Sequence, residues 1–448
     1  MITLNEKLHG NTAKKPSFKS LTPLGAAAKA ADIFIKSQEN LSSTRFIQDT
    51  ATNWLPKAVF SRSKADFAEM SFLEFIESAI FYFAPPILGE KLFRNGLFKH
   101  LQPGSIKNKV NELIPKSIKE LEADKTLPAE LKKRAVSLKA GIILACAAIP
   151  IAEYTLSFAK NLFTLKTFKK SNFNNIANLD KSGRENEDKT VQTRVEKNAK
   201  KQLKKAAALS AAGIAAGALL AGFGHKSDAL QKVSKTVINP FSPLSNLFRK
   251  AGAGNNKAVN ALSAFSLDFE NNAGKLALSK GQLALTAILG LFGYSKAAED
   301  RGKLDKAEVW TRVPLVVFYT IFGSELFEKG FSKLLKKKNI FPDIVKTAQD
   351  GRIKLPLRAE LPKLAQELAL KKGTAVSAEY SRLLKQKAAV QGVPYAFSLL
   401  FMGFTLSGIT RLWTQYRYNY EMKQKLNLKN ISFKNAPKSS VFKEFFKD

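Results

Sequence analysis

The chain has few of the residues that build metal centres and disulfides. Its 448 residues include one cysteine, Cys146, and three histidines that lie far apart in sequence, His9, His100 and His225. One cysteine excludes an intrachain disulfide, and no cysteine or histidine cluster has the spacing of a zinc site. We therefore predict that the protein holds no metal ion.

Motifs of the common enzyme classes are also missing. The sequence contains no His-Glu-x-x-His helix and no Gly-x-Ser-x-Gly elbow, and the glycines near Gly252 follow no strand and precede no Gly-Lys-Ser/Thr. The N-terminal segment 1–30 carries five lysines but no apolar stretch of signal-peptide length, so we interpret it as a basic tail. We predict a non-enzymatic protein with no catalytic residues and no cofactor.

Positive charge is in large excess. The 72 lysines and arginines outnumber the 37 aspartates and glutamates and leave a net charge of +35. Such a field attracts phosphate-rich partners, either lipid headgroups or nucleic acid. Long uncharged apolar runs accompany this charge, and a soluble nucleic-acid binder would have to bury them. We therefore expect a membrane and anionic lipid as partners and do not expect nucleic acid.

The strongest membrane-span signal is the segment 388–410, which has no charged side chain at 23 positions. About 20 residues of helix cross a hydrocarbon core about 30 Å thick. Weaker candidates are 72–93, 138–163, 206–224, 276–295 and 309–330. We predict an all-α fold, a polytopic helical membrane protein with four to six membrane-embedded helices and long basic helical connections. We also expect a break or kink near Pro85 and Pro86. The Lys and Arg content of the loops assigns no orientation, and the sequence does not say which membrane is crossed.

Aromatic and cationic side chains follow the segment 388–410. Rings bury their faces at a headgroup interface while guanidinium groups stay wet, so this set is predicted to be an interfacial anchor. Its members are Arg411, Trp413, Tyr416, Arg417 and Tyr418.

Two further sets of residues stand out inside the apolar segments. Glu153 lies near the middle of its run with Lys160 two turns on, and a mid-span carboxylate must pair with a cation or line a wet cavity. These two residues are our candidate intramembrane polar site. Gly213 and Gly217 stand four apart on one helix face and predict close packing against another helix, from this chain or from a second copy in a homo-oligomer. An Ala-rich helix with incidental glycines is an equal alternative.

Three short matches, in the same order, suggest an internal duplication of a helix pair. Lys64–Glu69 matches Lys303–Glu308 at an offset of 239, Glu90–Phe93 matches Glu328–Phe331 at 238, and Tyr154–Ser157 matches Phe404–Ser407 at 250. The two copies would be 64–163 and 303–413.

These observations divide the chain into six parts. We predict a basic N-terminal tail with an interfacial helix (1–63), a first membrane helix pair (64–163), a charged linker (164–205), a middle membrane pair with a loop (206–302), a second pair (303–413) and a basic C-terminal tail (414–448). The leading functional hypothesis is a non-enzymatic, multi-pass integral membrane protein whose basic loops engage anionic lipid or an acidic partner. The alternatives are a transporter or channel built on the duplicated pair, and a soluble, basic helical protein that binds nucleic acid.

Overall fold

The computed structural model describes residues 25–39, 43–180, 188–253, 256–272, 275–347 and 353–434. It is predominantly helical, and within these ranges the strands form only two antiparallel hairpins. The expected all-α fold is therefore confirmed. Positions 1–24 of the predicted N-terminal tail, the charged run 181–187 and positions 435–448 of the predicted C-terminal tail lie outside the described residues.

The chain divides into two compact units, of which unit 1 comprises 1–45 and 324–397 and unit 2 comprises 46–323 and 398–448. Unit 2 therefore contains all of the predicted first helix pair, 64–163. The predicted second pair, 303–413, has its residues 324–397 in unit 1.

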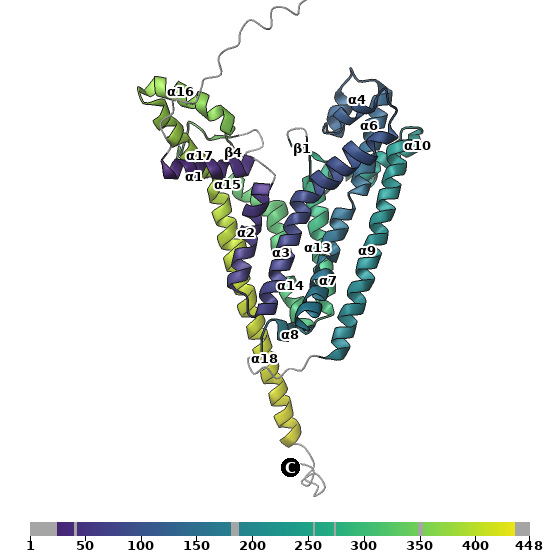
Figure 1. The fold of residues 1–448 in the computed structure, drawn as a ribbon, viewed down its shortest axis with the longest axis vertical. Coiled ribbons are helices and arrows are strands. Elements are labelled where there is room, and N and C mark those ends of the chain that lie inside the picture. The colour runs from purple at the N-terminus through teal and green to yellow at the C-terminus, as the bar shows by residue number, and fades with distance from the viewer. Residues whose placement is uncertain are drawn as a thin grey trace, which may run out of the picture. The chain divides into compact units, whose positions relative to one another are not determined.

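Unit 1 is a small helical assembly built around α17 (Figure 1). Helices α1 and α16 both pack against α17, and Ile35, Leu361 and Leu383 are fully buried between them. An ion pair joins Asp32 to Arg358 near this core. The elements are α1 (Ala26–Glu39), α15 (Ser324–Lys337), β3 (Lys346–Thr347), β4 (Ile353–Lys354), η6 (Arg358–Glu360), α16 (Leu361–Lys372) and α17 (Val376–Phe397).

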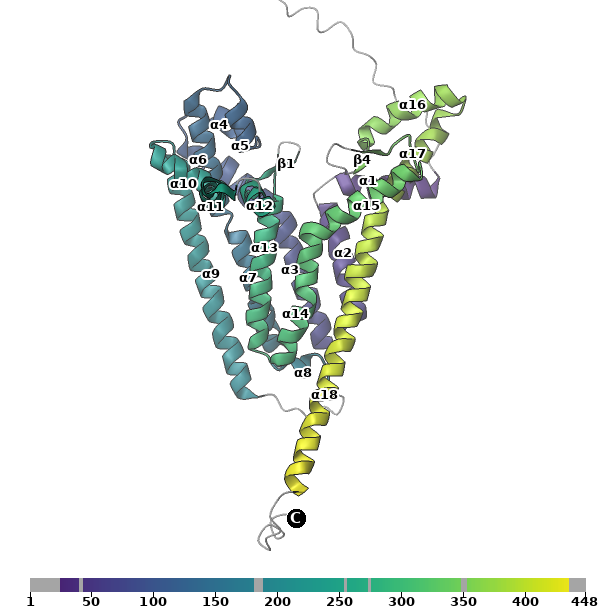
Figure 2. The same cartoon turned by 180° about the vertical axis from the view of Figure 1, so that it is seen from behind.

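Unit 2 is a bundle of long helices with short helices at one end (Figures 1 and 2). Its long helices are α2 (Ser43–Val59), α3 (Lys64–Ala84), α6 (Ala129–Ala145), α7 (Ala148–Phe168), α9 (Lys189–Phe223), α13 (Lys280–Glu299), α14 (Lys303–Phe318) and α18 (Leu406–Lys434). The shorter elements are η2 (Pro85–Leu97), η3 (Lys99–Leu101), α4 (Lys107–Leu113), α5 (Ile118–Ala123), α8 (Phe173–Ile176), α10 (Asp228–Ile238), α11 (Ser242–Phe248), η4 (Arg249–Ala253), α12 (Lys257–Ala264), β1 (Glu270–Asn272), β2 (Lys275–Ala277), η5 (Tyr319–Gly323) and η7 (Ser398–Thr405).

Six helices of unit 2 make pairwise contacts that close into a cycle. Helix α3 packs against α7, α7 against α13, α13 against α14, and α14 against α18. Helix α2 completes the cycle, because Trp54 packs on Phe67 of α3 while Phe60, which follows α2, packs on Phe404 of η7, directly before α18. Helices α6 and α9 lie outside the cycle, and α9 packs against both α6 and α7.

The close contact between α6 and α9 depends on glycine. A Cβ atom on Gly217 would stand 2.5 Å from the carbonyl oxygen of Gly141, and one on Gly213 would stand 2.9 Å from that of Leu144. Both distances are too short for a side chain, so the two backbones approach each other where these glycines stand. The structure thus places the predicted packing pair, Gly213 and Gly217, against α6.

Prolines lie at the start of, or shortly before, three π-helical segments. The α-helical pattern of α3 ends at Ala84, and a π-helix begins at Pro85. Pro314 lies inside α14 ahead of the π-helix η5, and Pro394 lies inside α17 ahead of the π-helix η7. Proline removes one backbone donor and clashes with the preceding turn, and a local change of helix type accommodates both effects. The segments 72–93 and 388–410 therefore remain helical but change helix type.

Within the described residues, four helices are long and apolar enough to cross a membrane, judged by length and composition: Lys64–Leu101, Ala129–Phe168, Lys189–Phe223 and Val376–Asn427. They coincide with the candidates 72–93, 138–163, 206–224 and 388–410. The candidates 276–295 and 309–330 are not among these four.

Candidate functional site

Buried charged residues gather at the end of the bundle that carries α8. Glu69 of α3 accepts from Arg301 and from Lys160 of α7, each at 2.7 Å, and from the hydroxyl of Thr164 at 2.9 Å. Arg301 also lies 2.9 Å from Asp305. The side chain of Glu69 is 2% exposed and that of Arg301 is 1% exposed, so these charges depend on one another rather than on water.

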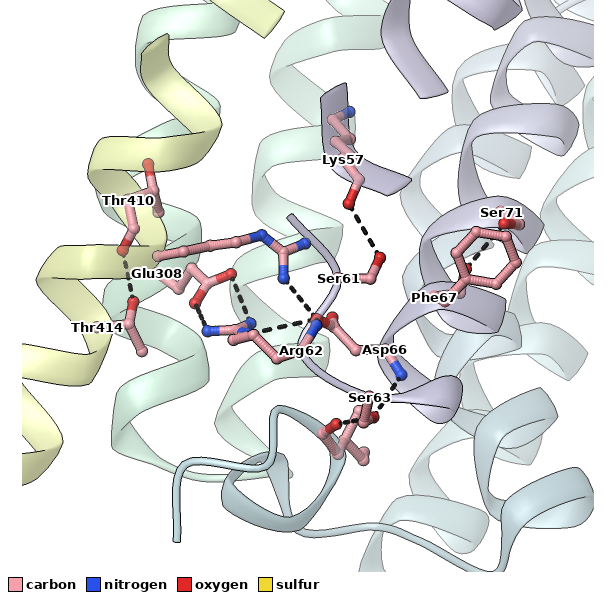
Figure 3. Close-up of polar contacts among 12 residues, drawn as sticks. Lys57, Ser61, Arg62, Ser63, Asp66, Phe67, Ser71, Glu308, Thr410 and Thr414 are labelled. Carbon is pink, nitrogen blue, oxygen red and sulfur yellow. Dashed lines mark hydrogen bonds and ion pairs between the residues drawn. The ribbon is translucent and has the colours of Figure 1, made fainter. Parts of the chain in front are cut away.

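Figure 3 shows a second group of ion pairs, around Arg62 and Asp66. Arg62 donates to both carboxylate oxygens of Glu308, at 3.0 and 3.2 Å, and its backbone N–H donates to Asp66 at 2.9 Å. Arg411 of α18 is also paired with Asp66. The hydroxyl of Ser63 accepts from the backbone N–H of Asp66 and caps the start of α3.

Together these eight residues form what we call the lower ion layer. Its cations are Arg62, Lys160, Arg301 and Arg411, and its anions are Asp66, Glu69, Asp305 and Glu308. Four charges of each sign make the layer neutral. Phe173 of α8 adds to it, because the guanidinium carbons of Arg62 and Arg301 lie 5.3 and 5.7 Å from the centre of its ring. Burial opposes the charge of Arg301, but the carboxylates of Asp305 and Glu69 outweigh this and raise its pKa.

Two carboxyl groups of the same bundle meet without a cation between them. The hydroxyl of Tyr294 in α13 lies 2.9 Å from Oε1 of Glu153 in α7 and 3.3 Å from Oε2 of Glu77 in α3. Glu153 is 2% exposed, and its other carboxylate oxygen has no hydrogen-bond partner among the described residues. Gly290 leaves room for this side chain, since a Cβ there would lie 3.1 Å from the carboxylate. We call Glu77, Tyr294 and Glu153 the acidic trio.

Ion pairs are also buried at the opposite end of the bundle. Glu90 and Arg94 of η2 pair at 2.7 Å, and Glu90 also accepts from the backbone N–H of Leu276 at 3.2 Å. Lys139 of α6 has a fully buried side chain and pairs with Asp268. We call these two pairs the upper ion layer.

The predicted polar pair, Glu153 and Lys160, lies on α7 as expected from its position in the sequence, but the two side chains have different partners. Lys160 belongs to the lower ion layer through Glu69, whereas Glu153 belongs to the acidic trio. The structure therefore does not pair them with each other.

The residues of the predicted interfacial anchor occupy two faces of α18. Arg411 and Tyr418 are only 6% exposed, and Tyr418 packs with Phe173 and Leu304. Trp413 and Tyr416 are exposed and stacked, with ring centres 5.8 Å apart, and Arg417 lies over the Trp413 ring. Of the predicted anchor residues, Trp413, Tyr416 and Arg417 lie on the exposed face, whereas Arg411 and Tyr418 pack α18 against the bundle.

Reasoning from the sequence did not identify most of the lower ion layer. Asp66, Glu69, Asp305 and Glu308 were noticed only as members of two matching stretches. Arg62 and Arg301 were missed, although they stand at the same offset of 239 just before those stretches. Extending the match by two residues would have given Arg-x-Lys-x-Asp-x-Ala-Glu twice, a pattern with two cations and two anions in each copy. Tyr294 carries no signal in the sequence, because only the packing of α13 on α7 brings it to Glu153.

No protein-family model, curated protein or solved structure matches this chain. The function must therefore be argued from the contacts described above.

Proposed function

We propose that this chain is a multi-pass integral membrane protein that binds anionic lipid headgroups through cations on its helices and catalyses no reaction. The observation that carries the membrane assignment is the separation of the two buried ion layers. Glu69 and Glu90 on α3 and η2 have the same spacing in the sequence as Lys139 and Lys160 on α6 and α7, almost six helical turns in each case. At about 1.5 Å per helical residue this is at most roughly 31 Å, because one path includes the π-helix that begins at Pro85 and the other includes the break between α6 and α7. This upper value compares with the ~30 Å thickness of a hydrocarbon core.

On α3, η2, α6 and α7 few charges lie between the two layers. In α6 and α7 the only charged residue between Lys139 and Lys160 is Glu153, and between Glu69 and Glu90 there are Glu74, which is paired with Lys57, and Glu77. Charged side chains are costly in hydrocarbon unless they face the bundle interior. Glu74 and Glu153 are both buried, as this argument requires, and Glu77 is half-buried.

The outer surface of the bundle favours lipid over water. Helix α9 exposes Leu209, Leu219 and Phe223 to 60%, 61% and 50%. Exposed apolar side chains in such number along one helix indicate an apolar surrounding, either lipid or another helix.

Cations adjoin this apolar surface. Helix α9 is continuous through the junction between its charged half and its uncharged half, which begins at Ala206. Lys201, Lys204 and Lys205 are exposed just before the junction. Ala199 packs with Phe158, so these lysines begin within about two helical turns inside the lower ion layer, and their long stems must run back along the apolar surface for the amines to reach phosphate groups. Each well-placed cation contributes about 1 kcal/mol toward an anionic membrane. Arg417, beside the exposed rings of α18, is a second candidate for the same contact.

Lipid binding is tested with the triple variant Lys201→Gln, Lys204→Gln, Lys205→Gln in lipid nanodiscs. Native mass spectrometry of the released protein would count retained phosphatidylglycerol against phosphatidylcholine. About 3 kcal/mol in total corresponds to a preference for anionic lipid reduced by up to roughly 100-fold.

The matched control removes the same charge elsewhere, with Lys109, Lys119 and Lys125 changed to glutamine, and all three of these lysines are exposed in the region of α4 and α5. We expect this control to retain anionic lipid as the wild type does. Equal lipid retention by both triple variants would contradict binding at the α9 junction.

A carbonate wash of a membrane fraction tests the membrane assignment itself and separates it from the nucleic-acid alternative. An integral protein stays in the pellet after the wash. Release into the supernatant would contradict every proposal that places helices across the bilayer and would favour a soluble, basic, nucleic-acid-binding protein.

We also propose that the bundle contains a duplicated helical unit, with α3 and α7 equivalent to α14 and α18. The support is a reciprocal pattern of contacts at the offset of 239. Arg62 pairs with Asp66 of its own copy and Glu308 of the other, and Arg301 pairs with Asp305 of its own copy and Glu69 of the other. Such an exchange is what a pseudo-twofold axis between the copies would produce. An experimental structure tests this by superposing the two helix pairs. A displacement of Arg62 from Arg301 by more than one helical turn, about 5.4 Å, would contradict the duplication.

A transporter or channel is the second candidate function. The observation that favours it is the carboxylate of Glu153 inside the bundle, which has no cation partner among the described residues. Ion flux into liposomes, wild type against Glu153→Gln, separates the two functions. Flux that the substitution abolishes would favour transport, and negligible flux in both would favour the lipid-binding protein.

A further inference from the structure

If both of its carboxyl groups are ionised, the acidic trio has one hydrogen-bond donor, the Tyr294 hydroxyl, for two acceptors. The Tyr294 hydroxyl has one hydrogen and lies within hydrogen-bond distance of a carboxyl oxygen of Glu153 and one of Glu77. It can donate to only one of them. If both carboxyls were ionised, the other would face a lone pair of the hydroxyl oxygen, and two negative charges would share a site in which Glu153 is buried and Glu77 is half-buried.

Among the described residues no cation forms an ion pair with Glu77 or Glu153, although Lys57 and Arg312 lie near enough to attract the charged form of Glu77. The nearby charged groups are Glu74 of α3, which is already paired with Lys57 of α2, and Arg312 of α14, which forms no ion pair with either carboxyl. Helix α9, on the other side of α7, turns the uncharged residues Val195, Ala199 and Ala206 inward. The second oxygen of Glu153 is buried with no partner among the described residues, so the site has an unused acceptor that points to a ligand.

We propose that Glu77, Tyr294 and Glu153 form a proton-binding site inside the bundle. A proton from water forms an O–H bond on Glu77, that O–H donates to the hydroxyl oxygen of Tyr294, and the hydroxyl donates to Glu153. Release reverses the step and returns the proton to water. The unused oxygen of Glu153 accepts a second proton when the site is fully loaded. Gly290 has no side chain to collide with Glu153, which is why α13 can approach the carboxylate so closely.

The site lies within the apolar part of the bundle. Glu77 is eight residues from Glu69, and Glu153 is seven residues from Lys160, or roughly 10 to 12 Å of helix from the lower ion layer. A carboxyl group at that depth needs a proton, a counter-ion or a wet cavity. The inference depends on neither lipid binding nor transport, because it concerns only where a hydrogen resides.

Infrared spectroscopy of the whole protein in liposomes tests the proposal. A protonated carboxyl absorbs at a frequency distinct from that of a carboxylate, and the band shifts in heavy water. We expect such a band at neutral pH in the wild type, its loss in Glu77→Gln, and a shift to higher frequency in Tyr294→Phe, which removes the hydroxyl but keeps the ring.

The matched control is Glu196→Gln, which alters a half-buried, ion-paired carboxylate of α9 far from the trio in sequence and should leave the band unchanged. If Glu77→Gln does not fold, Tyr294→Phe and the wild type still decide the matter. Absence of the band in the wild type, or a band that neither trio variant changes, would overturn the proposal. Because the readout is a carboxyl vibration, the result is independent of the lipid-retention assay.

Discussion

The strongest quantitative prediction compares two carboxylates that each bind two cations and differ in burial. Glu69 is 2% exposed and pairs with Lys160 and Arg301, whose side chains are 10% and 1% exposed. Glu196 is 32% exposed and pairs with Lys166 and Lys200, whose side chains are 58% and 64% exposed. A change to glutamine preserves the shape of either side chain and removes its charge.

The expected losses of stability differ because water can solvate the cations around Glu196 but not those around Glu69. Glu69→Gln leaves two buried cations short of a counter-charge, and breaking a buried pair typically costs about 3–5 kcal/mol. Glu196→Gln leaves two cations that water solvates, and an exposed pair contributes about 0–1 kcal/mol. The two costs differ by about 2–5 kcal/mol, so the ratio of the two unfolding equilibrium constants should lie between roughly 30-fold and several thousand-fold.

The assay is unfolding of the purified protein in mixed micelles by increasing dodecyl sulfate. All three tryptophans, Trp54, Trp310 and Trp413, lie in unit 2 and report on the bundle that contains both carboxylates. Equal destabilisation by the two substitutions, or a smaller effect at Glu69, would refute the claim that the lower ion layer is a buried, mutually dependent network.

Two further predictions concern packing and pH. Gly217→Ala should destabilise the bundle by about 1–3 kcal/mol, since the new Cβ would stand 2.5 Å from a carbonyl oxygen of α6. Gly222→Ala places its Cβ in open space and should stabilise the bundle by up to about 1 kcal/mol. The same micelle assay measures both changes, and equal signs would contradict the close approach of α6 and α9. In unit 1, a hydrogen bond from Arg382, reinforced by Lys372, lowers the pKa of Asp343 despite its partial burial. This stabilisation is complete above the ordinary aspartate pKa of about 3.9 and is lost as the pH falls through the lower folded value. Asp343→Asn should therefore speed amide hydrogen exchange in α16 at neutral pH and have no effect once the pH is well below that folded value; an effect that grows in acid would contradict the sign.

The sequence by itself determined the helical class and the most apolar segments. A run such as 206–224 is uncharged over 19 positions, and its composition alone makes it a helix whose surface is apolar. The match between Lys64–Glu69 and Lys303–Glu308 was also readable, because it needs only the order of residues.

Only the tertiary structure decided what the charged residues contact. Glu153 and Lys160 stand two turns apart on one helix, which suggested that they form one site. In the structure Lys160 pairs with Glu69 of α3, and Glu153 accepts a hydrogen bond from Tyr294 of α13. Arg62 reaches Glu308 across 246 positions of sequence, a contact that no local pattern encodes. Periodicity determines which face of a helix a residue occupies. Which helix packs against that face depends on the packing of the whole bundle. The acidic trio could therefore be found only once the positions of α3, α7 and α13 were known.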